Sequence, residues 1–261
     1  MRTGFYANLG NTALQLGAYG DGWLADGRFE AAALRREGTW DRAVAHILDA
    51  AGVSPSSVQR CALCASTPDV LALCAALAEV TGVAPSVLGR DMTVPMQADY
   101  DPPGSLGQDR LLSGYAAAAM VGRPCIVLDA GTCLTCEAVS PEGVLLPVAI
   151  APGLPALLSG VTQSAAHLSP ALQRAVADWA TPRSPARSSA ESLLSGLHHC
   201  LVGTARELVA AARSALDGTS APIVLTGGDA PTVLAALGAE VAHYPLLLLD
   251  GLRLLADEMR L

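Results

Sequence analysis

The sequence predicts an α/β fold built by duplication, in which two halves each follow the element order βββαβαβα. A short glycine loop occurs twice, at 8–12 and 129–132, and each copy lies between two apolar runs. After each loop the strand-like and helix-like segments follow in the same order. The halves divide near residue 121, so we expect one half of residues 1–121 and a second of 122–261.

In the first half, the spacing of apolar residues predicts the elements. After the first loop, a second apolar run ends at the Gly20-Asp21-Gly22 turn. Trp40, Val44 and Ile47 recur at helical spacing. Thr67-Pro68-Asp69 signals a helix start. The elements we expect are strands at 4–7, 23–29, 58–65 and 85–88 and helices at 39–51, 67–82 and 108–120.

The second half repeats this order. Residues 125–128 and 223–225 are apolar throughout, as is typical of strands in a sheet that helices cover on both faces. Ligands of such sheets bind at the carboxyl ends of the strands, so we expect a nucleotide in the cleft between the halves. The elements we expect are strands at 125–130, 133–139, 144–151, 222–226 and 241–244 and helices at 154–166, 189–217, 230–237 and 246–259.

Each loop combines groups that bind phosphate. Gly10 and Gly131 let backbone N–H groups approach an anion closely, and Thr12 and Thr132 add hydroxyl donors. Asp129, at a strand end, can hold a metal ion. Two such loops facing each other predict a clamp for the phosphates of a nucleotide.

Composition narrows the class of protein. Hydrophobic residues make up 51% and charged residues 15% of the chain. No apolar stretch approaches the ~20 residues of a membrane span, and polar residues interrupt any signal-peptide pattern at the N-terminus. The net charge is −8 and basic residues form no run. We therefore expect a cytoplasmic enzyme that binds neither membrane nor nucleic acid.

The chain contains no lysine, because all 16 Lys and Arg residues are arginines. A Walker P-loop needs a lysine to reach the terminal phosphates, so that mechanism is excluded. Schiff-base chemistry is excluded for the same reason. The charge on bound ATP must be met by metal ions, backbone N–H groups and arginine.

Seven cysteines include the pairs Cys61/Cys64 and Cys133/Cys136, each with zinc-like spacing. Each pair falls in a predicted strand, where residues three apart point to opposite faces. Neither pair can then chelate one zinc ion without a turn. We interpret the cysteines as buried thiols of a protein from a reducing compartment.

Seven short motifs follow one another along nearly the whole chain, and each is common by itself. In this order they resemble those of the type III pantothenate kinases, within the superfamily of actin, sugar kinases and heat-shock chaperone ATPases. The resemblance implies the actin-like, ribonuclease H-like two-domain fold. The motifs are Asn8-Leu9-Gly10-Asn11-Thr12; Tyr100-Asp101-Pro102-Pro103 with Gly107-Gln108-Asp109-Arg110; Asp129-Ala130-Gly131-Thr132; Ala149-Ile150-Ala151-Pro152-Gly153-Leu154; Ser189-Ala190-Glu191 with Ser195-Gly196; Thr226-Gly227-Gly228; and Asp250-Gly251-Leu252-Arg253-Leu254.

The resemblance implies a role for each matched residue. Asp109 would be the general base that takes the proton from the pantothenate hydroxyl. Asp129 would hold a monovalent cation, K⁺ or NH₄⁺, while Mg²⁺ would accompany ATP, the phosphoryl donor. Tyr100, Gly107, Gln108, Arg110 and Ser189 would bind pantothenate, and Asn8, Gly10, Asn11, Thr12, Gly131, Thr132, Gly227 and Gly228 would bind ATP.

Several of these residues also have structural explanations. Asp109 opens a predicted helix, where the helix dipole favours an acid. The stretch 188–191 fits a capping box for the following helix. Gly227-Gly228 fits a strand-to-helix turn, and Tyr100 before two prolines fits a surface anchor. The neighbours His198 and His199 diverge by about 100° on a helix, which favours one packed and one solvated histidine over a metal site.

The chain departs from the family pattern at three places, all near the expected ATP side. Asn8 stands where most members have Asp, so this loop brings no charge to magnesium. Gln15 stands where a lysine is usual, three residues after the threonine of the loop. Pro147-Val148 replaces a Gly-Gly pair.

The sequence predicts an ATP-dependent pantothenate kinase that makes 4′-phosphopantothenate, the first step of coenzyme A biosynthesis. Two alternatives stay open: a catalytically impaired relative that binds nucleotide or regulates, and a kinase for another small alcohol. The chain is rich in Leu and Ala and only 4% aromatic, so its helices have more apolar face than one small core can bury. We expect a homodimer through 189–217 or 109–120, as the family also implies.

Overall fold

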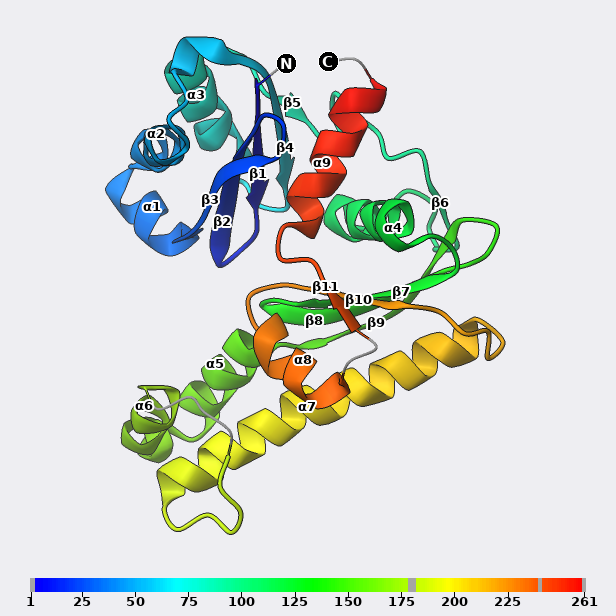
Figure 1. The fold of residues 1–261 in the computed structure, drawn as a ribbon. Coiled ribbons are helices and arrows are strands. Elements are labelled where there is room, and N and C mark those ends of the chain that lie inside the picture. Colours follow the sequence, from blue (N-terminus) through cyan, green and yellow to red (C-terminus); the bar gives the residue numbers. More distant parts are fainter. Residues whose placement is uncertain (1–2, 178–181, 239–240, 260–261) are drawn as a thin grey trace. The chain divides into compact units, whose positions relative to one another are not determined.

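The protein is described from a computed structural model that covers residues 3–177, 182–238 and 241–259. The chain forms two compact units (Figure 1). Unit 1 consists of Met1–Met96, Asp101–Ala116 and Leu246–Leu261, and unit 2 of Gln97–Tyr100 and Ala117–Pro245. The longest continuous part of unit 2 begins at Ala117. The C-terminal helix, however, packs with the first half of the chain.

Unit 1 is built on a five-stranded sheet in the order β3-β2-β1-β4-β5. The antiparallel strands β1 (Thr3–Leu9), β2 (Ala13–Tyr19) and β3 (Trp23–Glu30) follow one another as hairpins. On its other side, β1 runs parallel to β4 (Val58–Ala65), which is parallel to β5 (Ser86–Val87). The carboxyl ends of β1 and β4 therefore lie side by side.

Helices cover both faces of this sheet. On one face, α1 (Ala31–Glu37), α2 (Trp40–Ala51) and α3 (Val70–Thr81) enclose a core that includes Phe5 and Leu63. On the other face, Tyr6 and Cys64 pack with the start of α4 (Gln108–Val121) and with α9 (Leu247–Glu258). Burial on both faces explains why β1 and β4 read as continuous apolar runs.

Unit 2 repeats this topology. Its sheet has the order β11-β10-β7-β8-β9-β6, so β9-β8-β7-β10-β11 corresponds to β3-β2-β1-β4-β5 of unit 1. The duplicated α/β fold class predicted from the sequence is confirmed. The elements are β6 (Gln97–Ala98), β7 (Cys125–Ala130), β8 (Cys133–Val139), β9 (Val144–Pro152), β10 (Ile223–Thr226), β11 (Val241–His243), α5 (Leu154–Ser164), α6 (Ser169–Ala177), α7 (Ser189–Ala215) and α8 (Ala230–Leu237).

Three elements were not predicted: α1, β6 and α6. Helix α1 has seven residues and buries only Ala31 and Leu34, too few for a visible helical stripe. Strand β6 is two residues long and exists because it pairs with β9, a long-range contact that local pattern does not reveal. The predicted helix 154–166 ends at Ser164, and a short 3-10 turn follows.

The cysteine interpretation agrees with the strand geometry. Cys61 packs in the core under α2 and α3, whereas Cys64 packs in the core under α4 and α9, so the two thiols lie on opposite faces of β4. Cys136 is buried, but Cys133 and Cys200 are exposed, so the interpretation as buried thiols is wrong for these two cysteines. Burial raises the pKa of the Cys61 thiol to about 12, which keeps it protonated. Across the described residues, no group of three metal-binding side chains comes together.

In the described part of the chain, no helix combines the length and the apolarity that a membrane span requires.

Candidate active site

The first loop closes the β1–β2 hairpin of unit 1. The Gly10 N–H donates to the Ala13 carbonyl at 2.9 Å, while Asn11 and Thr12 are exposed at the tip. A Cβ added at Gly10 would come no closer than 3.6 Å to other atoms of the protein, and Gly10 does not have a positive φ. Because the fold itself does not require glycine here, the residue leaves the loop backbone open to a close approach from outside.

The second loop, in unit 2, is enclosed by glycines from two other segments. A Cβ on Gly153, at the start of α5, would lie 2.2 Å from the Gly131 carbonyl oxygen. A Cβ on Gly227, which has φ +95°, would lie 2.4 Å from the Ala130 carbonyl oxygen and 2.5 Å from Asp129 Oδ1. Only glycine permits these approaches. They bring the N-terminal ends of α5 and α8 to the loop, where helix dipoles favour anions.

Hydrogen bonds hold the second loop in place. The Gly153 N–H donates to the Thr132 carbonyl at 3.1 Å, and the Asp229 N–H donates to the Ala130 carbonyl at 2.9 Å. The close contacts of Gly227 with Ala130 and Asp129 explain why this position is glycine, whereas its neighbour Gly228 is exposed. The predicted ATP residues Gly131, Thr132, Gly227 and Gly228 and the predicted metal ligand Asp129 all meet around this loop.

Asp109 lies in the first turn of α4. Its Oδ1 accepts a hydrogen bond from the Arg110 N–H at 2.9 Å. A Cβ on Gly107 would lie 2.6 Å from the same oxygen, so the glycine makes room for the carboxylate. Leu112, one turn along α4 from Asp109, packs in the same core as Cys64, so Asp109 lies near β4. Burial, and secondarily the negative charge of Asp109, raise the pKa of the Cys64 thiol.

Pairing across the sheet joins Asp109 to the first loop. Asn8 is the direct partner of Cys64 on β4 and of Gln15 on β2, and Gln15 is the partner of Arg28 on β3. Paired residues point to the same face of a sheet, so these four side chains form one row across four strands. Cys64, near Asp109, ends the row on one side and Arg28 ends it on the edge strand. Sequence reasoning singled out Asn8, Gln15 and Asp109 but missed Arg28.

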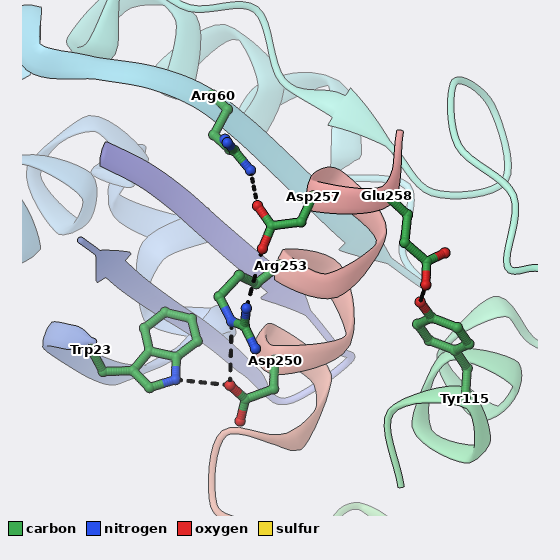
Figure 2. A network of polar contacts seen from close by, with 7 residues as sticks. All are labelled: Trp23, Arg60, Tyr115, Asp250, Arg253, Asp257 and Glu258. Carbon is green, nitrogen blue, oxygen red and sulfur yellow. Dashed lines mark hydrogen bonds and ion pairs between the residues drawn. The ribbon is translucent and has the colours of Figure 1, made fainter. Parts of the chain in front are cut away.

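Helix α9 joins the sheet to α4 within unit 1 (Figure 2). Trp23 Nε1 donates to Asp250 Oδ1 at 3.0 Å, and Arg253 lies 4.9 Å from the centre of the Tyr19 ring. Burial raises the pKa of Asp250, an effect that the Trp23 hydrogen bond and the Arg253 charge oppose. Arg60 on β4 pairs with Asp257, which also pairs with Arg253.

The opposite side of α9 contacts α4. The Tyr115 hydroxyl donates to Glu258 Oε1 at 2.7 Å. A Cβ on Gly251 would lie 2.9 Å from Leu112 Cδ1 and 3.2 Å from Ala116 Cβ. Figure 2 shows the Tyr115–Glu258 contact between the two helices. The helices approach closely at Leu112, one turn along α4 from Asp109.

The remaining predicted substrate residues are distributed as follows. Gln108 and Arg110 are half-buried beside Asp109 in unit 1. Tyr100 is 37% exposed and lies in unit 2, just after β6. Ser189 is exposed in the first turn of α7, and the capping box is present, because Ser188 Oγ accepts from the Glu191 N–H at 3.1 Å. His198 is half-buried and His199 exposed, in agreement with one packed and one solvated histidine.

Comparison with known proteins gives the family. A family profile described as type III pantothenate kinase matches residues 5–211. The chain belongs to the type III pantothenate kinase family. The type III pantothenate kinase of Streptomyces griseus is 34% identical over 77% of this chain and 75% of that protein. The one from Roseiflexus castenholzii is 29% identical over 97% and 98%, respectively. The family and the kinase class predicted from the motifs are thereby confirmed.

Solved structures with low sequence identity share the fold. The activator of the 2-hydroxyisocaproyl-CoA dehydratase from Clostridium difficile, with bound ADPNP, superposes with a TM-score of 0.57 at 11% identity, covering 99% of this chain and 96% of that chain. Component A of the (R)-2-hydroxyglutaryl-CoA dehydratase from Acidaminococcus fermentans gives 0.53 at 14% identity, covering 97% and 95%. These likenesses support the fold class alone.

Proposed function

We propose that this chain transfers the terminal phosphoryl group of ATP to the hydroxyl of pantothenate, forming 4′-phosphopantothenate and ADP in the cytoplasm. The observation that carries this proposal is the family match over residues 5–211, because that span contains the first loop, the segment around Asp109 and the second loop. The family pattern, rather than any one residue, identifies the acceptor.

Asp109 acts as the general base. In phosphoryl transfer the protein mainly positions the reactants and accepts the proton of the attacking hydroxyl. The Asp109 carboxylate is half-buried, and Gly107 leaves space beside one of its oxygens. The family pattern assigns the binding of pantothenate to Tyr100, Gly107, Gln108, Arg110 and Ser189.

The two glycine loops bind ATP. At the first loop, Gly10 and the exposed Asn11 and Thr12 offer N–H and hydroxyl donors, with Asn8 at the strand end. At the second loop, Gly131 and Thr132 face the N-terminal ends of two helices, a common arrangement for phosphate. Gly228, which is exposed, is the glycine that the adenosine approaches.

Asp129 fits a monovalent cation better than a protein-bound magnesium ion. Its Oδ1 lies close to backbone oxygens of the second loop, and among the described residues no group of three metal-binding side chains comes together. Hard cations prefer oxygen ligands, and Mg²⁺ is commonly held by substrate phosphates with few protein ligands. We therefore assign K⁺ or NH₄⁺ to Asp129 and expect Mg²⁺ to arrive with ATP, where it neutralises phosphate charge.

The decisive experiment is a product assay. Purified protein is incubated with ATP, Mg²⁺, K⁺ and pantothenate, and ADP and 4′-phosphopantothenate are measured by mass spectrometry. ADP formation that depends on pantothenate supports the proposal. Phosphorylation of a different small alcohol only would assign another substrate. Nucleotide binding without transfer to any alcohol would favour the regulatory alternative.

A further inference from the structure

We propose that Arg28, on the edge strand β3, binds the phosphate chain of ATP and supplies the positive charge that the lysine-free first loop lacks. This inference rests on the proposed function of that loop. It begins with the pairing of the strands. Arg28 is the direct partner of Gln15, and Gln15 is the direct partner of Asn8, so the three side chains point to the same face of the sheet.

Packing on both faces agrees with this direction. Ala25 and Phe29, whose side chains point opposite to that of Arg28, pack in the core under α1 and α2. Tyr6, two residues before Asn8, packs in the core under α9. Leu249 of α9 lies over Gly17, 3.1 Å from where a Cβ would stand. Gln15 is the next residue on that face toward the loop.

The register also connects the two departures in the loop. Asn8 and Gln15 stand where the family usually has an acid and a lysine, and here they face each other directly, with Cβ atoms about 5 Å apart. An acid and a lysine at these positions would be opposite charges on adjacent strands. Replacing only one of them would leave the other charge unpaired. In this chain the two positions form a neutral pair, and Arg28 carries the only charge among the four residues of this row.

Arg28 is long and exposed enough to act from the next strand. Adjacent strands are about 4.8 Å apart, less than the length of an arginine side chain. The residue is exposed, and in the described part of the chain it forms no ion pair. A guanidinium binds phosphate through two parallel hydrogen bonds, whereas a lysine acts as a point charge.

Two acids on the same strand act against this charge. Asp26 and Glu30 lie two residues to either side of Arg28 on the same face, and both are exposed. At a separation of about 7 Å in water, each weakens the binding of an anion about threefold. A direct charge-assisted contact improves affinity about 10- to 100-fold, so the contact with Arg28 outweighs them.

The test compares the binding of ATP and of a non-hydrolysable analogue to four variants by calorimetry, alongside steady-state kinetics. Arg28→Ala removes the charge, and Arg28→Lys keeps it without the paired hydrogen bonds. Gln15→Lys in the Arg28→Ala background returns a charge to the usual position. Arg42→Ala, an exposed arginine on α2 at the opposite face of the sheet, is the matched control. Thermal melts establish that each variant is folded.

We expect Arg28→Ala to lower the affinity for ATP about 10- to 100-fold, with the KM for pantothenate within twofold of the wild-type value. Gln15→Lys in the Arg28→Ala background should restore most of the lost affinity, Arg28→Lys should have an intermediate affinity, and Arg42→Ala should have no effect.

ATP binding by Arg28→Ala within twofold of wild type, or an equal loss in Arg42→Ala, would overturn the inference. If wild type binds ATP but does not phosphorylate pantothenate, the proposed function fails, and the same binding comparison still decides the role of Arg28. A wild type that binds no ATP would overturn both.

Discussion

At the scale of single residues, Asp109 is the group on which the proposed chemistry depends most. Asp109→Asn keeps the size of the side chain and its space beside Gly107 but removes the proton acceptor. We expect turnover to fall about 10²- to 10⁴-fold, while pantothenate binding, measured by calorimetry, stays nearly unchanged. A variant with wild-type turnover would remove Asp109 from the mechanism.

Asn8 tests how much charge the first loop needs. Asn8→Asp places a carboxylate at the end of β1, opposite the neutral Gln15. We expect ATP and Mg²⁺ to bind more tightly together by one to two decades, because a charge-assisted contact is worth roughly 1.5–3 kcal/mol. The KM for pantothenate should not change. If wild type is already active at low ATP concentration and Asn8→Asp does not change the affinity for ATP, another group supplies the charge that the first loop lacks.

If Asp129 holds a monovalent cation, the activity should depend on which monovalent cation is present. One carboxylate among backbone oxygens suits a large, weakly hydrated ion, and cavity size with the number of oxygen ligands decides between ions. Activity in K⁺ or NH₄⁺ should exceed activity in Na⁺ at equal ionic strength, and Asp129→Asn should abolish the difference. Equal rates in Na⁺ and K⁺ would contradict this assignment.

At the scale of elements, α9 connects the sheet of unit 1 to the helix that carries Asp109. Gly251→Ala would place a methyl group 2.9 Å from Leu112 Cδ1 and 3.2 Å from Ala116 Cβ, so the side chain of Leu112 or α4 itself must shift. Displacements of 1 Å at a reacting group can cost about 10²-fold, and we expect kcat to fall about 3- to 10-fold with unchanged ATP binding. Leu112→Val should partly restore kcat in the double variant.

The control for this prediction is Gly160→Ala on α5, where a Cβ would meet nothing within 4 Å. That change should leave kcat unchanged and stabilise the helix slightly. If Gly251→Ala lowers only the melting temperature and not kcat, α9 stabilises unit 1 without positioning Asp109.

The sequence predicted elements well where one local signal was strong. Strand β4 and helix α8 lie at their predicted bounds, because the β4 segment is bounded by turn residues and α8 ends at Gly238. Helix α1 and strand β6 were missed because their stability comes from packing and long-range pairing. Arg28 could have been found by counting the hairpin pairs outward from the first loop. Without the observed register, a shift of one residue would have placed it on the opposite face.

At the scale of the whole molecule, we predict a homodimer, but the structure changes how α7 could take part in it. The apolar stripe of α7, which includes Leu201, Ala205 and Val209, is already buried in the core of unit 2. Its outward face instead carries small exposed residues at a seven-residue spacing, Gly196, Gly203 and Ala210. Two glycines in an exposed helix cost about 1 kcal/mol each relative to alanine. Close packing against a second helix would offset that cost.

Light scattering at micromolar concentration should therefore give twice the chain mass of 26.6 kDa. Gly203→Arg should shift this mass toward the monomer, because a long side chain blocks helix contact at that face. We expect the monomer to fold normally with this substitution, because a Cβ at Gly203 meets nothing within 4 Å and arginine favours helix more than glycine does. Gly160→Arg on α5, where the space is equally open, is the matched control and should stay dimeric. A monomeric wild type would contradict the prediction of a dimer. If Gly203→Arg is dimeric, the interface does not include the outer face of α7.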